Sequence, residues 1–125
     1  MSEYELADYV SSMMGNFLSV ITIYFSIITA YVVAAFASGS KLTTTQLVIV
    51  NAVFVMAAGI IGSLTVVIFN RFYIFASQLQ VINNSSVLVN FTVPLAVLLI
   101  TLFVSSLVFM WTVRRTNKVL ETQED

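Results

Sequence analysis

The side chains that could carry out chemistry are few, and they lie at the two ends of the chain. Among the 125 residues there is no histidine and no cysteine. The carboxylates are Glu3, Glu5, Asp8, Glu121, Glu124 and Asp125. Metal sites, haem ligation and Ser-His or Cys-His nucleophiles require imidazole, thiolate or convergent carboxylates. We therefore expect no catalytic residue, no metal or cofactor site and no enzyme activity.

The overall composition indicates lipid, rather than water, as the solvent of most of the chain. Hydrophobic residues make up 59% and charged residues only 9%, whereas a soluble domain carries about 25% charged residues. The formal net charge is −1, so no basic field is available to attract nucleic acid. The expected partners are the bilayer and other membrane-embedded helices.

Three apolar runs are each long enough to cross a bilayer, which requires about 20 helical residues. The predicted spans are about 13–37, 46–70 and 87–113. A polar cluster ending at Lys41 separates the first two, and Pro94 falls in the first turns of the third, where a missing backbone donor costs least. The sequence thus predicts an all-α membrane protein with three transmembrane helices in a single domain, 1–125.

The helix of the first span is predicted to begin well before its apolar part. Ser2 and Glu5 have the spacing of a capping box, in which each side chain accepts from the other residue's backbone N–H. Leu6, Tyr9, Val10 and Met13 then share one side of the helix, so an amphipathic segment leads into the span.

Basic residues predict the orientation. Lys41 lies on the same side of the membrane as the tail 114–125, which carries Arg114, Arg115 and Lys118, whereas Arg71 lies on the other side. Cytoplasmic segments are enriched in lysine and arginine. We therefore expect the C-terminus in the cytosol and the N-terminus outside.

The outer connector, 71–86, has the pattern of an amphipathic helix. Its apolar side chains recur at steps of three and four, at Phe72, Phe75, Leu79 and Ile82. If it continues the second span, the helix would measure nearly 60 Å, about twice the hydrocarbon thickness. Two interpretations follow: an interfacial helix resting on lipid, or an outer collar covered by neighbouring copies or a partner protein.

Small residues mark two candidate packing surfaces, because they let a neighbouring backbone approach closely. In the first span they recur at every fourth position: Thr22, Ser26, Ala30, Ala34 and Ser38. In the second span they form two overlapping pairs: Ala58, Gly59, Gly62 and Ser63. These surfaces serve either association between chains or packing among the chain's own three helices.

Two polar side chains within the spans are candidates for buried contacts. Tyr24 lies near the middle of the bilayer, where its hydroxyl should have a partner. Asn51 either bonds to another helix or lies in the membrane–water interface, near the cytosolic end of the second span. No charged residue lies inside a predicted span, which argues against a proton relay or an ion-coupled carrier.

The function expected from these features is non-enzymatic and depends on helix packing, in a homo-oligomer or as an accessory or structural subunit of a membrane complex. The alternative is an oligomeric pore, with hydroxyl groups lining a channel. In size and topology alone the chain resembles the three-span phage holins, short proteins with an outer N-terminus and a cytosolic C-terminus. That resemblance implies pore formation in the bacterial inner membrane.

Overall fold

The described part of the chain folds into three long helices. A computed structural model describes residues 2–83 and 90–123, and within them it contains α1 (Glu3–Ser38), α2 (Thr44–Asn83) and α3 (Thr92–Gln123) and no strand. Each helix is long and apolar enough to cross a membrane. The predicted all-α fold with three membrane-spanning helices is therefore confirmed. Positions 84–89, which include the end of the predicted connector and the start of the third predicted span, lie outside the described residues.

The capping box fixes the start of α1. The backbone N–H of Glu5 donates to Ser2 Oγ at 3.3 Å, and the backbone N–H of Ser2 donates to Glu5 Oε2 at 2.8 Å. These bonds satisfy two donors that a helix start would leave unpaired. The predicted capping box is confirmed, and α1 runs unbroken for 36 residues, about 54 Å at 1.5 Å per residue.

A tight turn joins α1 to α2, and Gly39 is needed there for space rather than for an unusual backbone angle. Its φ is −57°, in the right-handed helical region, and its N–H donates to the Ala35 carbonyl at 2.9 Å. A Cβ at Gly39 would lie 3.2 Å from Met110 Sδ and would collide with the Ala35 carbonyl. The glycine therefore lets the turn approach α3.

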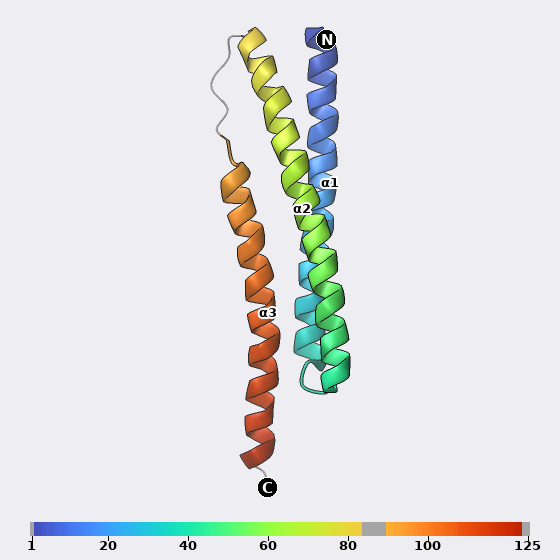
Figure 1. Cartoon of the computed structure of the whole chain (residues 1–125), viewed down its shortest axis with the longest axis vertical. Coiled ribbons are helices and arrows are strands. Elements are labelled where there is room, and N and C mark those ends of the chain that lie inside the picture. The colour runs from blue at the N-terminus through green and yellow to red at the C-terminus, as the bar shows by residue number, and fades with distance from the viewer. Residues whose placement is uncertain (1, 84–89, 124–125) are drawn as a thin grey trace.

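The second helix is longer than the membrane is thick. Its 40 residues span about 60 Å, so the predicted continuation of the second span is confirmed as far as Asn83. Figure 1 shows α1 and α2 extending together beyond the start of α3. We name the described residues of this extension, 3–12 and 72–83, the hairpin extension.

Part of the amphipathic connector is covered by α1 of the same chain, a contact that neither predicted interpretation included. The Tyr9 ring meets the Phe75 ring edge-on, with centroids 4.8 Å apart, and Leu6 and Ala76 are buried. The reason is that α1 starts early enough to accompany α2 out of the apolar region.

The third helix begins at Thr92, later than the predicted span, and it is preceded by a local cap. The Thr92 N–H donates to Asn90 Oδ1 at 3.0 Å, and the Leu95 N–H reaches the Phe91 carbonyl at 2.9 Å. At its other end α3 continues through the predicted tail, 114–125, as far as Gln123. Of the three helix pairs, α1 and α2 pack most extensively.

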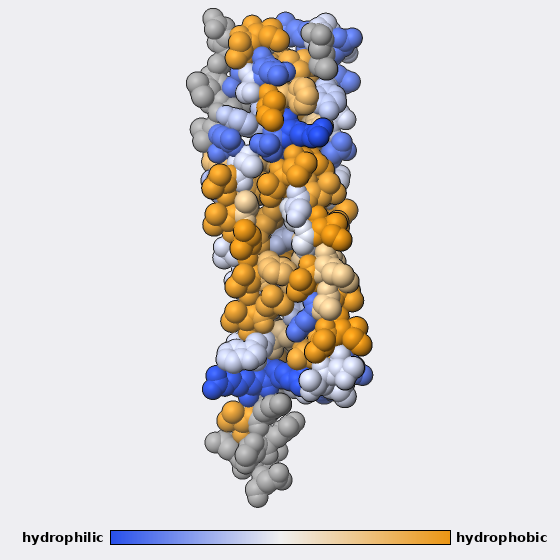
Figure 2. Space-filling view, in the orientation of Figure 1, coloured by the Kyte–Doolittle hydropathy of each residue, from blue (hydrophilic) through white to orange (hydrophobic). Residues whose placement is uncertain are grey.

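On the face of the bundle shown in Figure 2, an apolar band lies between two hydrophilic ends. Lys41, Arg114 and Arg115 lie at one end of the bundle. We call it the loop end, because the α1–α2 turn is there. Arg71 lies at the opposite boundary, where the hairpin extension starts. Side chains within the band can face hydrocarbon without leaving unpaired backbone groups, because the helices satisfy their own.

Candidate helix-packing site

A stack of three aromatic rings, one from each helix, forms the centre of the bundle. The Tyr31 ring of α1 lies on the Phe54 ring of α2, with centroids 3.8 Å apart and planes 15° from parallel. Phe54 in turn stacks on Phe103 of α3 at 5.4 Å and 13°. Such contacts bury large flat surfaces with few rotatable bonds. The stack therefore holds the three helices in a fixed position along the bundle axis relative to one another.

Tyr31 also provides a polar link between α1 and α2. Its hydroxyl donates to Oδ1 of Asn51 at 2.6 Å. Asn51 is half-buried and Tyr31 is buried. The Asn51 carboxamide, predicted as a candidate for a buried contact, thus has a partner on another helix. The bond crosses the interface between α1 and α2, about one turn from the ring stack.

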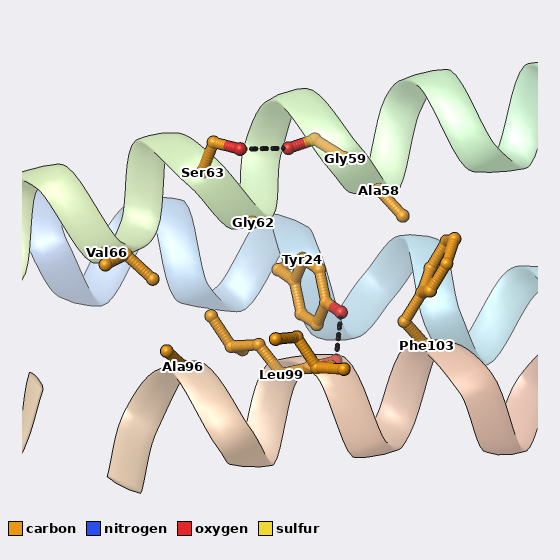
Figure 3. Close-up of a pocket in the computed structure, with 10 residues that line it drawn as sticks. Tyr24, Ala58, Gly59, Gly62, Ser63, Val66, Ala96, Leu99 and Phe103 are labelled. Carbon is orange, nitrogen blue, oxygen red and sulfur yellow. Dashed lines mark hydrogen bonds between the residues drawn. The ribbon is translucent and has the colours of Figure 1, made fainter. Parts of the chain in front are cut away.

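Tyr24 provides the corresponding link between α1 and α3. Only 2% of its surface is exposed, and its hydroxyl donates to the backbone carbonyl of Leu99 at 2.7 Å. Figure 3 shows the ring lying between α2 and α3 with its oxygen directed at Leu99. A helical carbonyl has a second lone pair. The Leu99 carbonyl can therefore accept the Tyr24 hydrogen bond and keep its backbone hydrogen bond within α3.

The small residues of α2 divide between packing within the chain and an open groove. Ala58 is 2% exposed, and a Cβ at Gly62 would lie 3.1 Å from Cε2 of Tyr24, so the glycine allows α1 to approach. Gly59 and Ser63 are exposed, and Ser63 Oγ donates to the Gly59 carbonyl at 2.7 Å. These four residues line one side of an apolar groove of about 240 Å³ between α2 and α3 (Figure 3).

The small-residue stripe of α1 faces away from the other two helices. All five of its members, Thr22, Ser26, Ala30, Ala34 and Ser38, are exposed. The buried side of α1 is instead formed by Phe17, Tyr24, Ile28, Tyr31 and Ala35. Packing among the chain's own helices therefore leaves the stripe uncovered.

The structure lengthens this stripe toward the N-terminus. Gly15 and Ser19 are exposed, a Cβ at Gly15 would meet nothing within 4 Å, and Ser19 Oγ donates to the Gly15 carbonyl at 3.0 Å. We call the enlarged surface the α1 small face; its residues are Gly15, Ser19, Thr22, Ser26, Ala30, Ala34 and Ser38. The spacing from Gly15 to Ser26 alternates between four and three, a signal that a search for every fourth residue misses.

Three hydroxyl groups of the α1 small face, those of Ser19, Thr22 and Ser26, are satisfied within the helix. Thr22 Oγ1 donates to the Leu18 carbonyl at 2.7 Å, and Ser26 Oγ donates to the Thr22 carbonyl at 2.8 Å. Serine and threonine commonly bond to their own helix in this way. Another helix could thus pack on the face without stranding these three hydroxyl groups.

The predicted outer contact face is partly covered. Phe72, Phe75 and Leu79 are half-buried, whereas Ile82 remains 53% exposed. Phe69 connects this region to the span below, because its ring lies 5.0 Å from Phe17 and 6.0 Å from Phe72. Aromatic contacts therefore continue from the membrane-spanning part into the hairpin extension.

The remaining chemistry of the described residues is sparse. No three of their histidine, cysteine, aspartate or glutamate side chains gather in a way that could hold a metal ion. No protein-family model, no curated protein and no solved structure matches the chain. The surfaces through which the helices pack are thus the main candidate functional features of the described residues.

Proposed function

We propose that this chain is a non-enzymatic membrane protein that works by helix packing, and that its α1 small face binds the α1 helix of a second copy. The observation that carries the proposal is the exposure of the whole small-residue stripe while a different side of α1 packs against α2 and α3. Packing within one chain was the competing explanation of the stripe, and it does not use these residues.

The energetic argument depends on how closely two backbones can approach. In lipid there is no hydrophobic driving force between helices, so association depends on van der Waals packing and on close backbone contacts. Large side chains such as Val97, Val104 and Val108 face outward from α3 and hold a neighbour at a distance. Along α1, glycine, serine, threonine and alanine leave the backbone accessible, which favours α1 as the contact helix.

A matched pair of substitutions tests the proposal. Ser26 lies on the α1 small face, and Ser105 lies on the exposed side of α3. Ser26→Leu would fill the contact, whereas Ser105→Leu makes the same chemical change on a surface that faces lipid. The readout is energy transfer between C-terminally labelled copies in liposomes, measured over a range of protein-to-lipid ratios.

For the unmodified protein we expect saturable energy transfer. Ser26→Leu should weaken association about tenfold, equivalent to about 1.4 kcal/mol, and Ser105→Leu should leave it unchanged. If the unmodified protein remains monomeric at every protein-to-lipid ratio, self-association is refuted. If such a monomer is recovered from its own membrane with a stoichiometric subunit that Ser26→Leu releases, the accessory-subunit function replaces the homo-oligomer.

A second candidate function, a pore, is favoured by the gathering of hydroxyl groups on one exposed face. Ser19, Thr22 and Ser26 would line a channel if several copies turned these faces inward. Release of dyes of graded size from liposomes distinguishes the two functions. Vesicles that stay tight at protein densities where energy transfer is saturated support a packing role, whereas size-limited leakage supports the pore.

A further inference from the structure

At the loop end of the bundle, the guanidinium group of Arg114 is incompletely paired. Its Nη2 donates to Thr44 Oγ1 at 3.4 Å, a long hydrogen bond, while its Nη1 is buried and has no hydrogen-bond partner among the described residues. A buried donor on a charged group is costly to leave unpaired. Nη1 itself is covered by the chain, but Arg114 as a whole is only half-buried, so an anion beside its side chain would stabilise the positive charge.

The N-terminus of α2 lies next to this guanidinium group and is itself suited to an anion. Thr43 and Gln46 cap it reciprocally, with Thr43 N–H to Gln46 Oε1 at 3.0 Å and Gln46 N–H to Thr43 Oγ1 at 3.3 Å. The cap is uncharged, and no acidic residue lies in the first turn of α2. The partial positive charge of the helix end is therefore not neutralised by any acidic side chain in that turn.

Two further cations lie at the same end. Lys41 belongs to the turn that is held against α3, because Gly39 sits beside Met110 and Thr44 beside Arg114. Arg115 lies over the Trp111 ring, 5.3 Å from its centroid. Every carboxylate whose side chain is described, on Glu3, Glu5 and Asp8, belongs to the opposite end of the bundle.

The expected depth of Arg114 and Trp111 in the membrane indicates what kind of anion would bind. Trp111 is 62% exposed and carries Arg115 over its ring, and tryptophan favours the interface where lipid headgroups lie. A phosphate at that level belongs to a lipid. We propose that Arg114, Thr44 and the N-terminus of α2 bind the phosphate of one anionic phospholipid, with Lys41 adding charge.

The proposal is tested with the full chain in bilayer nanodiscs that contain equal amounts of phosphatidylglycerol and phosphatidylcholine. Native mass spectrometry measures which lipid remains bound as the nanodisc is stripped away. Arg114→Gln removes the inferred ligand, and Arg115→Gln removes a neighbouring charge that stacks on Trp111. Arg114→Lys keeps the charge but loses the forked donor geometry.

The unmodified protein should retain one phosphatidylglycerol in preference to phosphatidylcholine. Arg114→Gln should lower that retention at least tenfold, Arg114→Lys by less, and Arg115→Gln by no more than the roughly fivefold effect of a single surface charge. Equal losses from the two arginines would overturn the site, since they would indicate diffuse attraction only. Equal retention of the two lipids would overturn it as well, and displacement by millimolar inorganic phosphate would overturn the lipid assignment.

Discussion

The hydroxyl of Tyr31 lies 2.6 Å from Oδ1 of Asn51, and this bond ties α1 to α2 within a turn of the stack on Phe54. One side chain thus supplies both a directional polar contact and a large flat surface. Tyr24, two turns earlier on α1, supplies a similar polar contact to α3 through the Leu99 carbonyl. The two tyrosines thus join α1 to a different helix each, Tyr31 to α2 and Tyr24 to α3.

Removing the Tyr31 hydroxyl should weaken the contact between α1 and α2. Tyr31→Phe leaves Asn51 without its partner, and we expect a loss of about 1 kcal/mol, within the range measured for hydrogen bonds between membrane helices. The measurement is the free energy of unfolding in mixed micelles titrated with a denaturing detergent. Tyr73→Phe is the control, because no described residue bonds to the Tyr73 hydroxyl.

A double-mutant cycle separates this bond from other effects of the substitution. Combining Tyr31→Phe with Asn51→Leu should reveal a coupling of about 0.6–1.7 kcal/mol. Strictly additive effects would mean that the two side chains do not interact in the membrane.

The two central glycines of α2 should respond differently to alanine. Either substitution gains helix propensity worth up to about 1 kcal/mol. At Gly59 the new methyl group meets nothing within 4 Å, whereas at Gly62 it would lie 3.1 Å from the Tyr24 ring. Gly59→Ala should therefore stabilise the protein, and Gly62→Ala should stabilise it less or destabilise it.

The same detergent titration measures both glycine variants, with the free energy of unfolding as the quantity compared. A gain at Gly62 equal to that at Gly59 would show that the Tyr24 ring does not pack against α2 as described.

The hairpin extension should depend on the contact between Tyr9 and Phe75. Tyr9→Ala removes an edge-on ring pair worth about 0.5–1.5 kcal/mol beyond its buried area, so the ends of α1 and α2 should open more often. Hydrogen exchange followed by mass spectrometry should show faster exchange in 3–12 and 72–83 and no change within the apolar band. Tyr4→Ala should have no such effect, because Tyr4 is 85% exposed.

The first turn of α1 should loosen in acid. The hydrogen bond from the Ser2 backbone N–H, together with the Ser2 side chain, lowers the pKa of Glu5, which lies beyond the apolar part of the helix. A carboxylate with a lowered pKa stabilises the folded turn above its unfolded pKa, about 4.3, and this contribution disappears as the pH falls through the lowered value.

Chemical shifts of Ser2 and Glu5, followed by NMR from pH 7 to pH 2, measure the titration. The Glu5 carboxyl should titrate below the ordinary pKa of a glutamate, and the turn should loosen progressively as the pH falls through that lowered value. A Glu5 carboxyl that titrates at its ordinary value, with no accompanying shift at Ser2, would contradict the capping box.

Helix number and polar contacts could be predicted from the sequence for a physical reason. Long uncharged runs have no stable alternative to a helix in lipid, and a phenol or carboxamide at membrane depth requires a partner. What could not be predicted is which atom accepts. The partner of Tyr24 is a backbone carbonyl of Leu99, and every residue of a helix carries a carbonyl.

The buried side of α1 was also beyond prediction. In a soluble helix the apolar side marks the core, but lipid accepts apolar side chains as readily as a protein interior does. Leu18, Ile23 and Phe25 are exposed while Ile28 is buried, and nothing in their composition separates them. The contact between Tyr9 and Phe75 could not be predicted for the same reason. The sequence placed each residue on the apolar side of a helix, but it did not show that the two sides pack together.

Cysteine cross-linking along α1 tests the central claim most directly, because the chain contains no cysteine of its own. Single substitutions at successive positions from Gly15 to Ser38, oxidised in native membranes, report which side of α1 meets a second copy. Yields should peak on the α1 small face, at Ser19→Cys, Thr22→Cys and Ser26→Cys, and fall at Ile23→Cys and Phe25→Cys. A uniform yield along the helix, or none, would contradict association through this face.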